Sequence, residues 1–345
     1  MNGVVKTVLL AVATTAVAGC DMSFDDPSMV QDLRILGLKA DPPEFLGADY
    51  ADLDRDVRIS VLLADPLNEG KGGLECLLRA CVLSNDYRCD DNDSTVVLAK
   101  QPCVDGSNTF QVTVPADLIL ATRNADPSWM AIEAGIAQAI DQGVPPEIAE
   151  LGKSLYSGVA VWVEIVVSGG DHELRGLQSV IFSPENPKGR TANTNPTIAG
   201  VRLNGQVGGT VTEIPFSPGE SIRVEVLKTW DSKETFLLPT YDPPGGVATV
   251  DEYMTFAFYA DAGDFSPDTT TDKPPNIFNA DPEAEQKPVD LWSTWTAPAA
   301  DEVPADGVRF WFVLIDGRGG TDWITMKGVM KDATMDVPLT VPTVP

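Results

Sequence analysis

One histidine and many carboxylates are the side chains of this sequence that could carry acid–base chemistry. His172 is the only histidine among 345 residues. A Ser-His-Asp or Cys-His site would have to use it. It follows the turn sequence SGGD, where we expect an exposed hairpin tip, and no G-x-S-x-G elbow occurs in the chain. We therefore expect no catalytic residue and no enzyme activity.

Paired carboxylates leave one catalytic alternative open. Glycosidases use two acidic side chains and need no histidine. The chain has 51 Asp and Glu residues, which are too many for one pair to stand out. A secreted, lipid-anchored hydrolase acting on glycosides or peptides is therefore kept as an alternative function.

Two acidic stretches carry the oxygen ligands that calcium prefers. Asp90, Asn92 and Ser94 alternate within DDNDS, and Asp261 and Asp264 belong to a second acidic loop. The first stretch lacks the glycine and the distal glutamate of an EF-hand. Exposed acidic turns explain both stretches, and a calcium-stabilised adhesion module is a further alternative. No other cofactor is expected.

Four cysteines, Cys76, Cys81, Cys89 and Cys103, fall within 28 residues. They form no C-x-x-C pair and have no histidine nearby, which argues against a metal site. In an exported chain they would form two disulfides, with three connectivities open. We expect them to hold a Cys-rich loop over residues 74–105.

The fifth cysteine ends an export signal. Lys6 and an apolar run over residues 8–17 lead into the sequence VAGC, which ends at Cys20. The apolar run is shorter than the ~20 residues that span a bilayer. VAGC resembles the bacterial lipobox, and this resemblance implies a signal peptide over residues 1–19 and a diacylglycerol and an acyl chain on Cys20.

Such an anchor would hold the chain in the cell envelope, because two or more acyl chains bind a membrane stably. We expect residues 20–30 to form a tether, and the outer membrane or cell surface to be the location. Asp21 resembles the inner-membrane retention signal of enterobacterial lipoproteins, so the inner membrane stays open.

The net charge of the chain limits the classes of partner that it can bind. The formal net charge is −27, and it becomes −28 without residues 1–19, which carry one Lys and no acid. A strongly acidic surface excludes nucleic acid as a partner. The expected partners are the membrane, through the lipid anchor, and an unknown envelope protein or polysaccharide.

Three pairs of similar segments reveal an internal repeat. They recur in the same order at offsets of 163, 165 and 149 residues. The pairs are ILGLKAD (35–41) and IAGVRLN (198–204), VRISVLLAD (57–65) and IRVEVLKTW (222–230), and VAVWVEIVVSGGD (159–171) and VRFWFVLIDGRGG (308–320). Repeats of this length indicate tandem domains. We place them at 31–183 and 196–345, joined by a polar linker over 184–195.

Short strands between Gly- and Pro-rich turns indicate a mainly β chain, built from two immunoglobulin- or fibronectin-like β-sandwiches. Alternation along 308–315 gives one fully apolar face and one mixed face that includes Trp311 and Val313. We expect the apolar face to pack on the second sheet of its own sandwich.

The first domain carries a helical-hairpin insertion, predicted over residues 126–156. Asp126 is a good N-cap, and Pro127 suits the first helical position. Apolar residues then follow at helical spacing: Trp129, Ile132, Ile136 and Ile140. We expect this hairpin to cover one end or edge of the first sandwich.

The lipobox, LRILGLKADPPEF (33–45), the Cys-bearing middle strand and FWFVLIDGRGGTDW (310–323) resemble uncharacterised surface lipoproteins of myxobacteria and related deltaproteobacteria. The resemblance implies tandem immunoglobulin-like domains and brings no catalytic residue. Because sandwiches present loops at their ends and the anchor would hold them near a membrane, the sequence favours a binding or scaffold protein.

Overall fold

The computed structural model describes most of the chain from residue 27 onward. The described ranges are 27–67, 73–82, 88–89, 95–185, 188–205, 210–229, 232–241, 244–272 and 291–331. The signal peptide, Cys20 and the first acidic stretch with Asp90, Asn92 and Ser94 lie outside them.

The first sandwich has two sheets that enclose one apolar core. One sheet has the order β1 (Arg34–Asp41), β3 (Arg55–Ala64), β6 (Gly106–Val114). The other has the order β2 (Glu44–Leu46), β8 (His172–Ser183), β7 (Val159–Gly169), β4 (Leu74–Cys81), β5 (Val96–Cys103). Alternate residues of β7, such as Val161, Val163 and Ile165, are fully buried between the sheets.

The second sandwich repeats this plan. One sheet has the order β9 (Ile198–Leu203), β11 (Ser221–Lys228), β17 (Trp292–Thr296), β15 (Asp264–Ser266). The other has the order β10 (Glu213–Phe216), β19 (Thr321–Met330), β18 (Val308–Asp316), β14 (Met254–Ala260), β16 (Thr269–Thr271). Its core is aromatic, with Trp295 and Phe310 packed edge to face 4.8 Å apart.

Equivalent strands in the two sandwiches carry the repeated sequences. The three pairs of similar segments fall on β1 and β9, on β3 and β11, and on β7 and β18. In each sandwich a short early strand also pairs in parallel with the last strand, β2 with β8 and β10 with β19. The prediction of two tandem immunoglobulin-like sandwiches is confirmed.

In the described part of the chain, each sandwich carries an insertion with secondary structure of its own. Between β6 and β7 lie α1 (Ala116–Ala125), α2 (Pro127–Asp141), α3 (Pro146–Ala149) and the 3-10 helix η1 (Glu150–Leu155). Between β11 and β14 lies the hairpin of β12 (Thr235–Tyr241) and β13 (Pro244–Asp251). Helix α2 begins at Pro127 after the N-cap Asp126, as the sequence indicates, and the hairpin ends with η1 at Leu155. The preceding helix α1 was not predicted; it forms because Leu118 and Ile119 bury one of its faces in the core.

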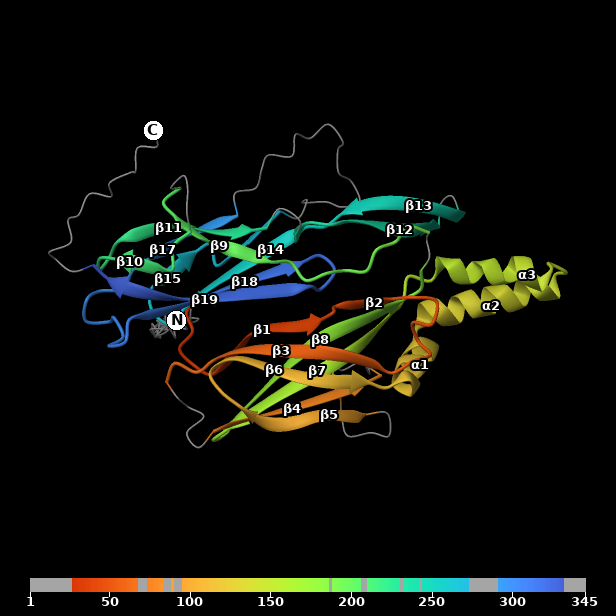
Figure 1. Ribbon diagram of the computed structural model, residues 1–345, viewed down its shortest axis with the longest axis horizontal. Coiled ribbons are helices and arrows are strands. Elements are labelled where there is room, and N and C mark those ends of the chain that lie inside the picture. Colours follow the sequence, from red (N-terminus) through yellow and green to blue (C-terminus); the bar gives the residue numbers. More distant parts are fainter. Residues whose placement is uncertain are drawn as a thin grey trace, which may run out of the picture.

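The helical hairpin is fixed at its root and projects from the first sandwich (Figure 1). At the root, Asp126 accepts hydrogen bonds from the Ser128 N–H and the Tyr156 hydroxyl, each 2.8 Å long. The Trp129 ring packs edge-on against Tyr156. Ile140, farther along α2, remains 39% exposed. The hairpin therefore packs on the sandwich through Trp129, Ile132 and Tyr156 at its root, whereas its far end does not cover the sandwich.

The two sandwiches stack face to face (Figure 1). The outer face of the β1–β3–β6 sheet packs on the outer face of β14, β18 and β19 through a third apolar cluster. Its buried members are Val30, Leu36, Leu62, Ala64, Trp311 and Val313. The mixed face of residues 308–315 is therefore an interface between domains, which the sequence pattern did not indicate.

At Gly37, the backbone of β1 lies very close to the side chain of Trp323 in the second sandwich. A Cβ atom on Gly37 would lie 3.1 Å from Cε3 of Trp323, which belongs to the other sandwich. A larger side chain at this position would have to push the indole, and with it the second sandwich, away from β1.

The chain just before β1 also joins the second sandwich. The Val30 N–H donates to the Ala260 carbonyl at 2.7 Å, and the Ala260 N–H donates to the Ser28 carbonyl at 2.9 Å. The Ser28 hydroxyl accepts a 3.2 Å hydrogen bond from the Phe265 N–H. The expectation of a free tether through residue 30 is thus corrected, because residues 28–30 are part of the fold.

The four described cysteines form two disulfides, as predicted, and the structure supplies the pairing that the sequence left open. Cys76 pairs with Cys103 and joins β4 to β5, while Cys81 pairs with Cys89 just after β4. Each bridge has one end on β4, which ties the Cys-rich loop to the middle of the sheet.

We predict that Gly37→Val lowers the free energy of unfolding by about 1–3 kcal/mol, because overpacking strains the interface. Trp323→Ala should remove the contact that creates this strain. In urea denaturation the two substitutions together should therefore cost less than the sum of their separate effects. Gly37→Val combined with Trp292→Ala, on the far sheet of the second sandwich, is the matched control and should be additive. Additivity in both pairs would contradict the stacked interface.

Candidate functional site: a groove between the two sandwiches

A groove lies where the two sandwiches meet. It has a volume of about 380 Å³ and is bounded by β1 and β8 of the first sandwich and by β18 and the β18–β19 turn of the second. Because each sandwich supplies one wall, the groove exists only while the domains are stacked.

The groove combines an apolar floor with a few polar groups, which is the usual chemistry of a ligand site. The apolar contacts come from Ile35, Leu36, Leu38, Leu177, Val313 and Ile315. Trp162, Arg175 and Gln178 supply an aromatic ring, a guanidinium and an amide. The lining residues in the described part of the chain include no carboxylate, histidine or thiol. The groove as described offers binding contacts rather than an acid–base pair.

Arg175 is held in place by acidic neighbours. Its guanidinium lies 2.9 Å from Oε1 of Glu173 and 3.3 Å from Oε1 of the buried Glu164. Glu164 also pairs with Arg79 at 2.5 Å across the adjacent strands β7 and β4. The hydrogen bonds that Arg175 donates to Glu173 are the main cause that raises the pKa of Arg175, so its positive charge is permanent.

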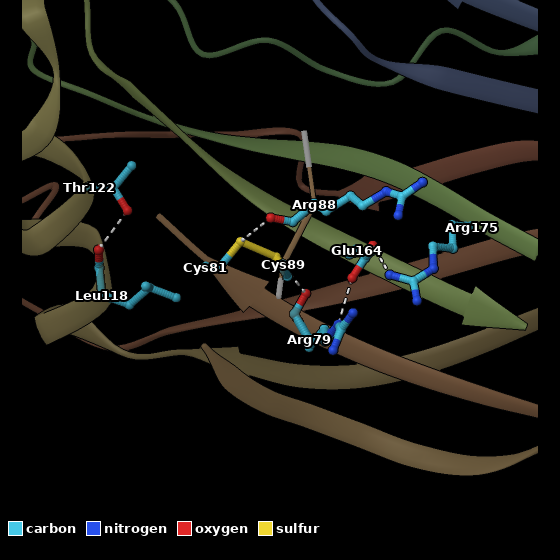
Figure 2. Close-up of a disulfide and its surroundings, with 8 residues drawn as sticks. All are labelled: Arg79, Cys81, Arg88, Cys89, Leu118, Thr122, Glu164 and Arg175. Carbon is cyan, nitrogen blue, oxygen red and sulfur yellow. Dashed lines mark hydrogen bonds and ion pairs between the residues drawn. A yellow bond between two sulfur atoms is a disulfide. The ribbon is translucent and has the colours of Figure 1, made fainter. Parts of the chain in front are cut away.

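The second disulfide lies beside this ion-pair chain (Figure 2). Cys81 and Cys89 are fully buried, and Sγ of Cys89 lies 4.0 Å from the carbonyl oxygen of Arg79. Figure 2 shows Arg79, Glu164 and Arg175 following one another from the disulfide. The Cys81–Cys89 bridge therefore packs beside Arg79, the first residue of the ion-pair chain that ends at Arg175 in the groove.

Gln178 links the two walls. Its side-chain amide donates to the carbonyl oxygen of Ser179 at 3.0 Å and to that of Gly319 at 3.4 Å. Gly319 belongs to the turn between β18 and β19, so this side chain joins β8 to the second sandwich. A change in domain stacking would alter the groove at this point.

Next to the groove, Arg318 forms a buried ionic junction between the domains. Its guanidinium pairs with Glu44 of β2 and lies 3.3 Å from Oε2 of Glu234. Arg190 of the connecting segment pairs with Glu44 at 2.8 Å. The exposed fractions of the Glu44, Arg190 and Arg318 side chains are 1%, 7% and 9%. The connecting segment is thus part of the junction and not a loose spacer.

Asp316 shapes the turn that presents Arg318. Its Oδ1 accepts hydrogen bonds of 2.8 Å from the N–H groups of Arg318 and Gly320. Its Oδ2 accepts from the Asn193 side chain at 3.3 Å. A Cβ atom on Gly320 would clash with Asp316 Oδ2 and lie 3.0 Å from the Thr194 carbonyl oxygen, so a side chain there would displace the Asp316 carboxylate from these hydrogen bonds.

Glu252 is the one carboxylate of the junction with a strongly raised pKa. Burial, followed by repulsion from Asp316, raises the pKa of Glu252 to about 7. Its Oε1 accepts no hydrogen bond from the described residues and lies 3.6 Å from Nη1 of Arg318. Burial also raises the pKa of Asp316. The junction therefore holds protons more tightly than an exposed acidic cluster would.

The second acidic stretch, for which calcium binding was an alternative, contains an ion pair. Asp261 accepts hydrogen bonds from Arg309, at 2.8 Å from the backbone N–H and 2.9 Å from Nε. Arg309 also reaches Asp105 of the first sandwich at 2.6 Å. Asp264 lies in β15, exposed. Asp261, which the sequence offers as an alternative calcium ligand, is thus the ion-pair partner of Arg309. Within the described residues no group of three or more His, Cys, Asp or Glu could hold a metal.

His172 lies exposed at the β7–β8 turn, opposite Gly169, and does not line the groove. The groove and junction residues themselves were not singled out by the sequence. Arg318 could have been found as a long cation between turn glycines, and Glu44 as a charge inside a strand. For Trp162 and Arg175 the sequence held no signal, because their environment depends on domain stacking.

Within the described residues, no helix has both the length and the apolar character needed to cross a membrane.

Comparisons with known proteins do not assign this chain to a family. No family model and no curated protein matches it. The chain shares 11% identity with the adhesin InvE of Yersinia pseudotuberculosis, covering 85% of this chain and 58% of that one, with a TM-score of 0.21. It shares 7% identity with a chimeric titin Z1Z2 tandem, covering 87% of this chain and 100% of that one, with a TM-score of 0.20.

The chain shares 8% identity with the native alpha-2-macroglobulin of E. coli, covering 87% of this chain and 17% of that one, with a TM-score of 0.23. Likenesses at these scores carry no argument about this chain. Strand order and pairing alone define its class, which is a two-domain immunoglobulin-like β-sandwich protein.

We predict that Glu252→Gln stabilises the protein increasingly as the pH rises from 5 to 8. The Glu252 pKa of about 7 lies above its value of 4.5 in an unfolded chain, so the folded state is penalised where the carboxyl must ionise. The advantage of the variant should be small near pH 5 and reach up to about 3 kcal/mol near pH 8. Urea denaturation at several pH values measures it, and a pH-independent difference would contradict the buried location of Glu252.

Proposed function

We propose that this chain is a lipid-anchored binding and scaffold protein of the cell envelope, which presents the groove between its sandwiches to a segment of another envelope protein. The observation that carries the proposal is the fusion of two sandwiches into one stacked unit with a mostly apolar groove at the seam. A preformed groove binds without first ordering two independent domains, which lowers the entropic cost of association.

The groove chemistry favours a peptide segment over a polysaccharide. Ile35, Leu38 and Ile315 offer apolar contact area that suits a Leu- or Phe-sized side chain. Arg175, 35% exposed, can donate to a carbonyl or carboxylate of the bound segment. A sugar would need many polar partners, whereas the polar side chains of the lining are few.

Export and anchoring are supported by two features. Buried disulfides are typical of proteins that fold in an oxidising compartment. The VAGC sequence at Cys20 supplies the anchor, and residues 28–30 place the following chain directly in the fold. The proposed anchor would thus be connected to both sandwiches by a short segment.

We expect Cys20→Ser to release the protein from membranes, because the thiol that would accept the lipid is lost. Fractionation of cells followed by a carbonate wash measures this, and mass analysis of the mature N-terminus identifies the lipid directly. Asp21→Ser, one residue away, is the matched control and should remain membrane-bound. A Cys20→Ser chain that still sediments with washed membranes would contradict the anchor.

A photo-crosslinking amino acid at Trp162 should capture the partner in intact envelopes, because this half-buried ring lines the groove. The same probe at Val104, which is 64% exposed and lies outside the groove, is the control. Ile315→Arg should reduce the Trp162 product at least tenfold by placing a charge in the apolar lining. Equal products from both probe positions, or a Trp162 product that Ile315→Arg leaves unchanged, would contradict binding in the groove.

A further inference from the structure

The groove between the sandwiches runs along an open edge of β8. Strand β8 pairs with β7 from His172 to Phe182, whereas β2 covers its other edge only at residues 181–183. On that side residues 174–180 pair with no strand of the described chain. Residues 175–179 all line the groove of about 380 Å³. The groove therefore lies where this sheet ends.

The path of the chain from β1 to β2 leaves this edge open. Strand β1 belongs to the opposite sheet, where it pairs with β3. The chain then crosses between the sheets at residues 42–43 and joins β8 as β2. The position in line with β2, beside residues 174–180, is thus left without a strand of the described chain. The pairing of β2 shows that this edge of β8 can hold one.

The pairing with β2 identifies the backbone groups that point to the open edge. The Ile181 N–H donates to the Pro43 carbonyl at 2.9 Å, and the Gly47 N–H donates to the Ser183 carbonyl at 3.1 Å. Residues 181 and 183 therefore direct their backbone polar groups away from β7. These groups alternate in direction along a strand, and the register of β7 and β8 has no shift. Residues 175, 177 and 179 therefore point to the same edge as residues 181 and 183.

The backbone groups at this edge are available for pairing. The Ser179 carbonyl accepts a 3.0 Å hydrogen bond from the Gln178 side chain. The N–H groups of residues 175, 177 and 179 and the carbonyls of residues 175 and 177 bond to no described residue. Donors and acceptors that alternate at strand spacing are matched by another extended segment, which supplies both kinds of group.

Apolar surface lies on both faces of the open edge. On the inner face, a Cβ atom on Gly176 would lie 2.8 Å from Cδ1 of Leu38, so β1 is in close contact there. On the outer face lies Trp162, which is opposite Ser179 in the register of β7 and β8. Successive side chains of a strand alternate between the two faces. A strand bound at this edge would therefore place apolar side chains against Leu38 on one face and against the indole on the other.

The second sandwich restricts which element can reach the edge. Ile315 and Gly319 form the opposite wall of the groove, and the Gln178 amide donates to the Gly319 carbonyl at 3.4 Å. A single extended segment fits between these walls better than the sheet edge of a folded domain. A second copy of the chain, with a formal net charge of −27, would also be repelled. Residues 174–180 contain no proline or lysine, the residues that commonly protect an open edge from pairing.

We propose that the partner segment binds in the groove as an added β-strand, which pairs its backbone with Arg175, Leu177 and Ser179 in line with β2. This inference rests on the proposed binding function and states what is recognised, namely the main chain of an extended and mostly apolar segment. Docking through side chains alone would bury the N–H groups at this edge without partners, which is unfavourable.

Hydrogen exchange in the free chain tests whether the edge is open. In the full chain carrying Cys20→Ser, the amide hydrogens of residues 175, 177 and 179 should exchange about a hundredfold faster than those of residues 176, 178 and 180. The second set faces β7 and is held in the ladder of hydrogen bonds. Exchange followed by NMR measures single residues, and equal protection of both sets would overturn the proposal.

Leu177→Pro tests the backbone pairing itself. Proline removes the Leu177 N–H, and a strand tolerates it where that N–H points away from the neighbouring strand. With the photo-crosslinking amino acid at Trp162, Leu177→Pro should reduce the partner product in intact envelopes at least tenfold. Leu177→Ala is the matched control, because it shortens the same side chain and keeps the N–H. It should reduce the product no more than about threefold.

The outcomes separate strand addition from the proposed function. Loss of the product in both Leu177 variants, or in neither, would overturn strand addition and leave binding in the groove in place. Absence of a Trp162 product from the otherwise unsubstituted chain would contradict both. A product with twice the mass of the chain would overturn the proposal, since the occupant would then be a second copy. Circular dichroism shows whether Leu177→Pro is folded, and Ser179→Pro with Ser179→Ala replaces this pair if it is not.

Discussion

Close packing of the outer face of β1 and β3 against the outer face of β18 and β19 is the contact on which the architecture depends. Trp311 and Val313 are almost fully buried there, although both point away from the core of their own sandwich. One face of β18 therefore packs in the core of its own sandwich, and the other face packs against the first sandwich, so the molecule has four stacked layers of sheet. Stacking of this kind replaces the flexible end-to-end arrangement that a polar linker would allow. The groove between the domains exists only as a result of this contact.

Buried charges fix how the domains stack. The tight turn at Asp316 positions Arg318, which forms an ion pair with Glu44 of the other sandwich. Apolar contact alone is non-directional and would tolerate sliding. A buried ion pair loses its compensation if the two partners separate, so it penalises any other register. We infer that the apolar cluster supplies the attraction between the domains, while the junction around Arg318 selects one alignment. The raised pKa of Glu252 is the electrostatic consequence of crowding carboxylates at that point.

Much of the fold could be predicted from the sequence, because short-range patterns of residues determine it. Alternation along residues 308–315, the repeated segments and the four clustered cysteines led to two sandwiches and two disulfides. The hairpin start at Asp126 could be predicted from its N-cap, but helix α1 could not, because α1 is stabilised by burial of Leu118 and Ile119 and has no side-chain N-cap. The candidate site could not be predicted, because it joins residues from distant parts of the chain. The face that carries Trp311 and Val313 is mixed in the sequence, so its alternation did not indicate that the other sandwich covers it. Asp261 illustrates the converse, since an acidic side chain that suggested calcium is bound by Arg309.

Small-angle X-ray scattering of the Cys20→Ser chain tests the stacked arrangement most directly. The account predicts a pair-distance distribution with one main maximum, because the centres of the two sandwiches lie side by side, and a profile that Gly37→Val broadens. Two separated maxima in the unsubstituted chain, as given by domains joined end to end, would contradict it.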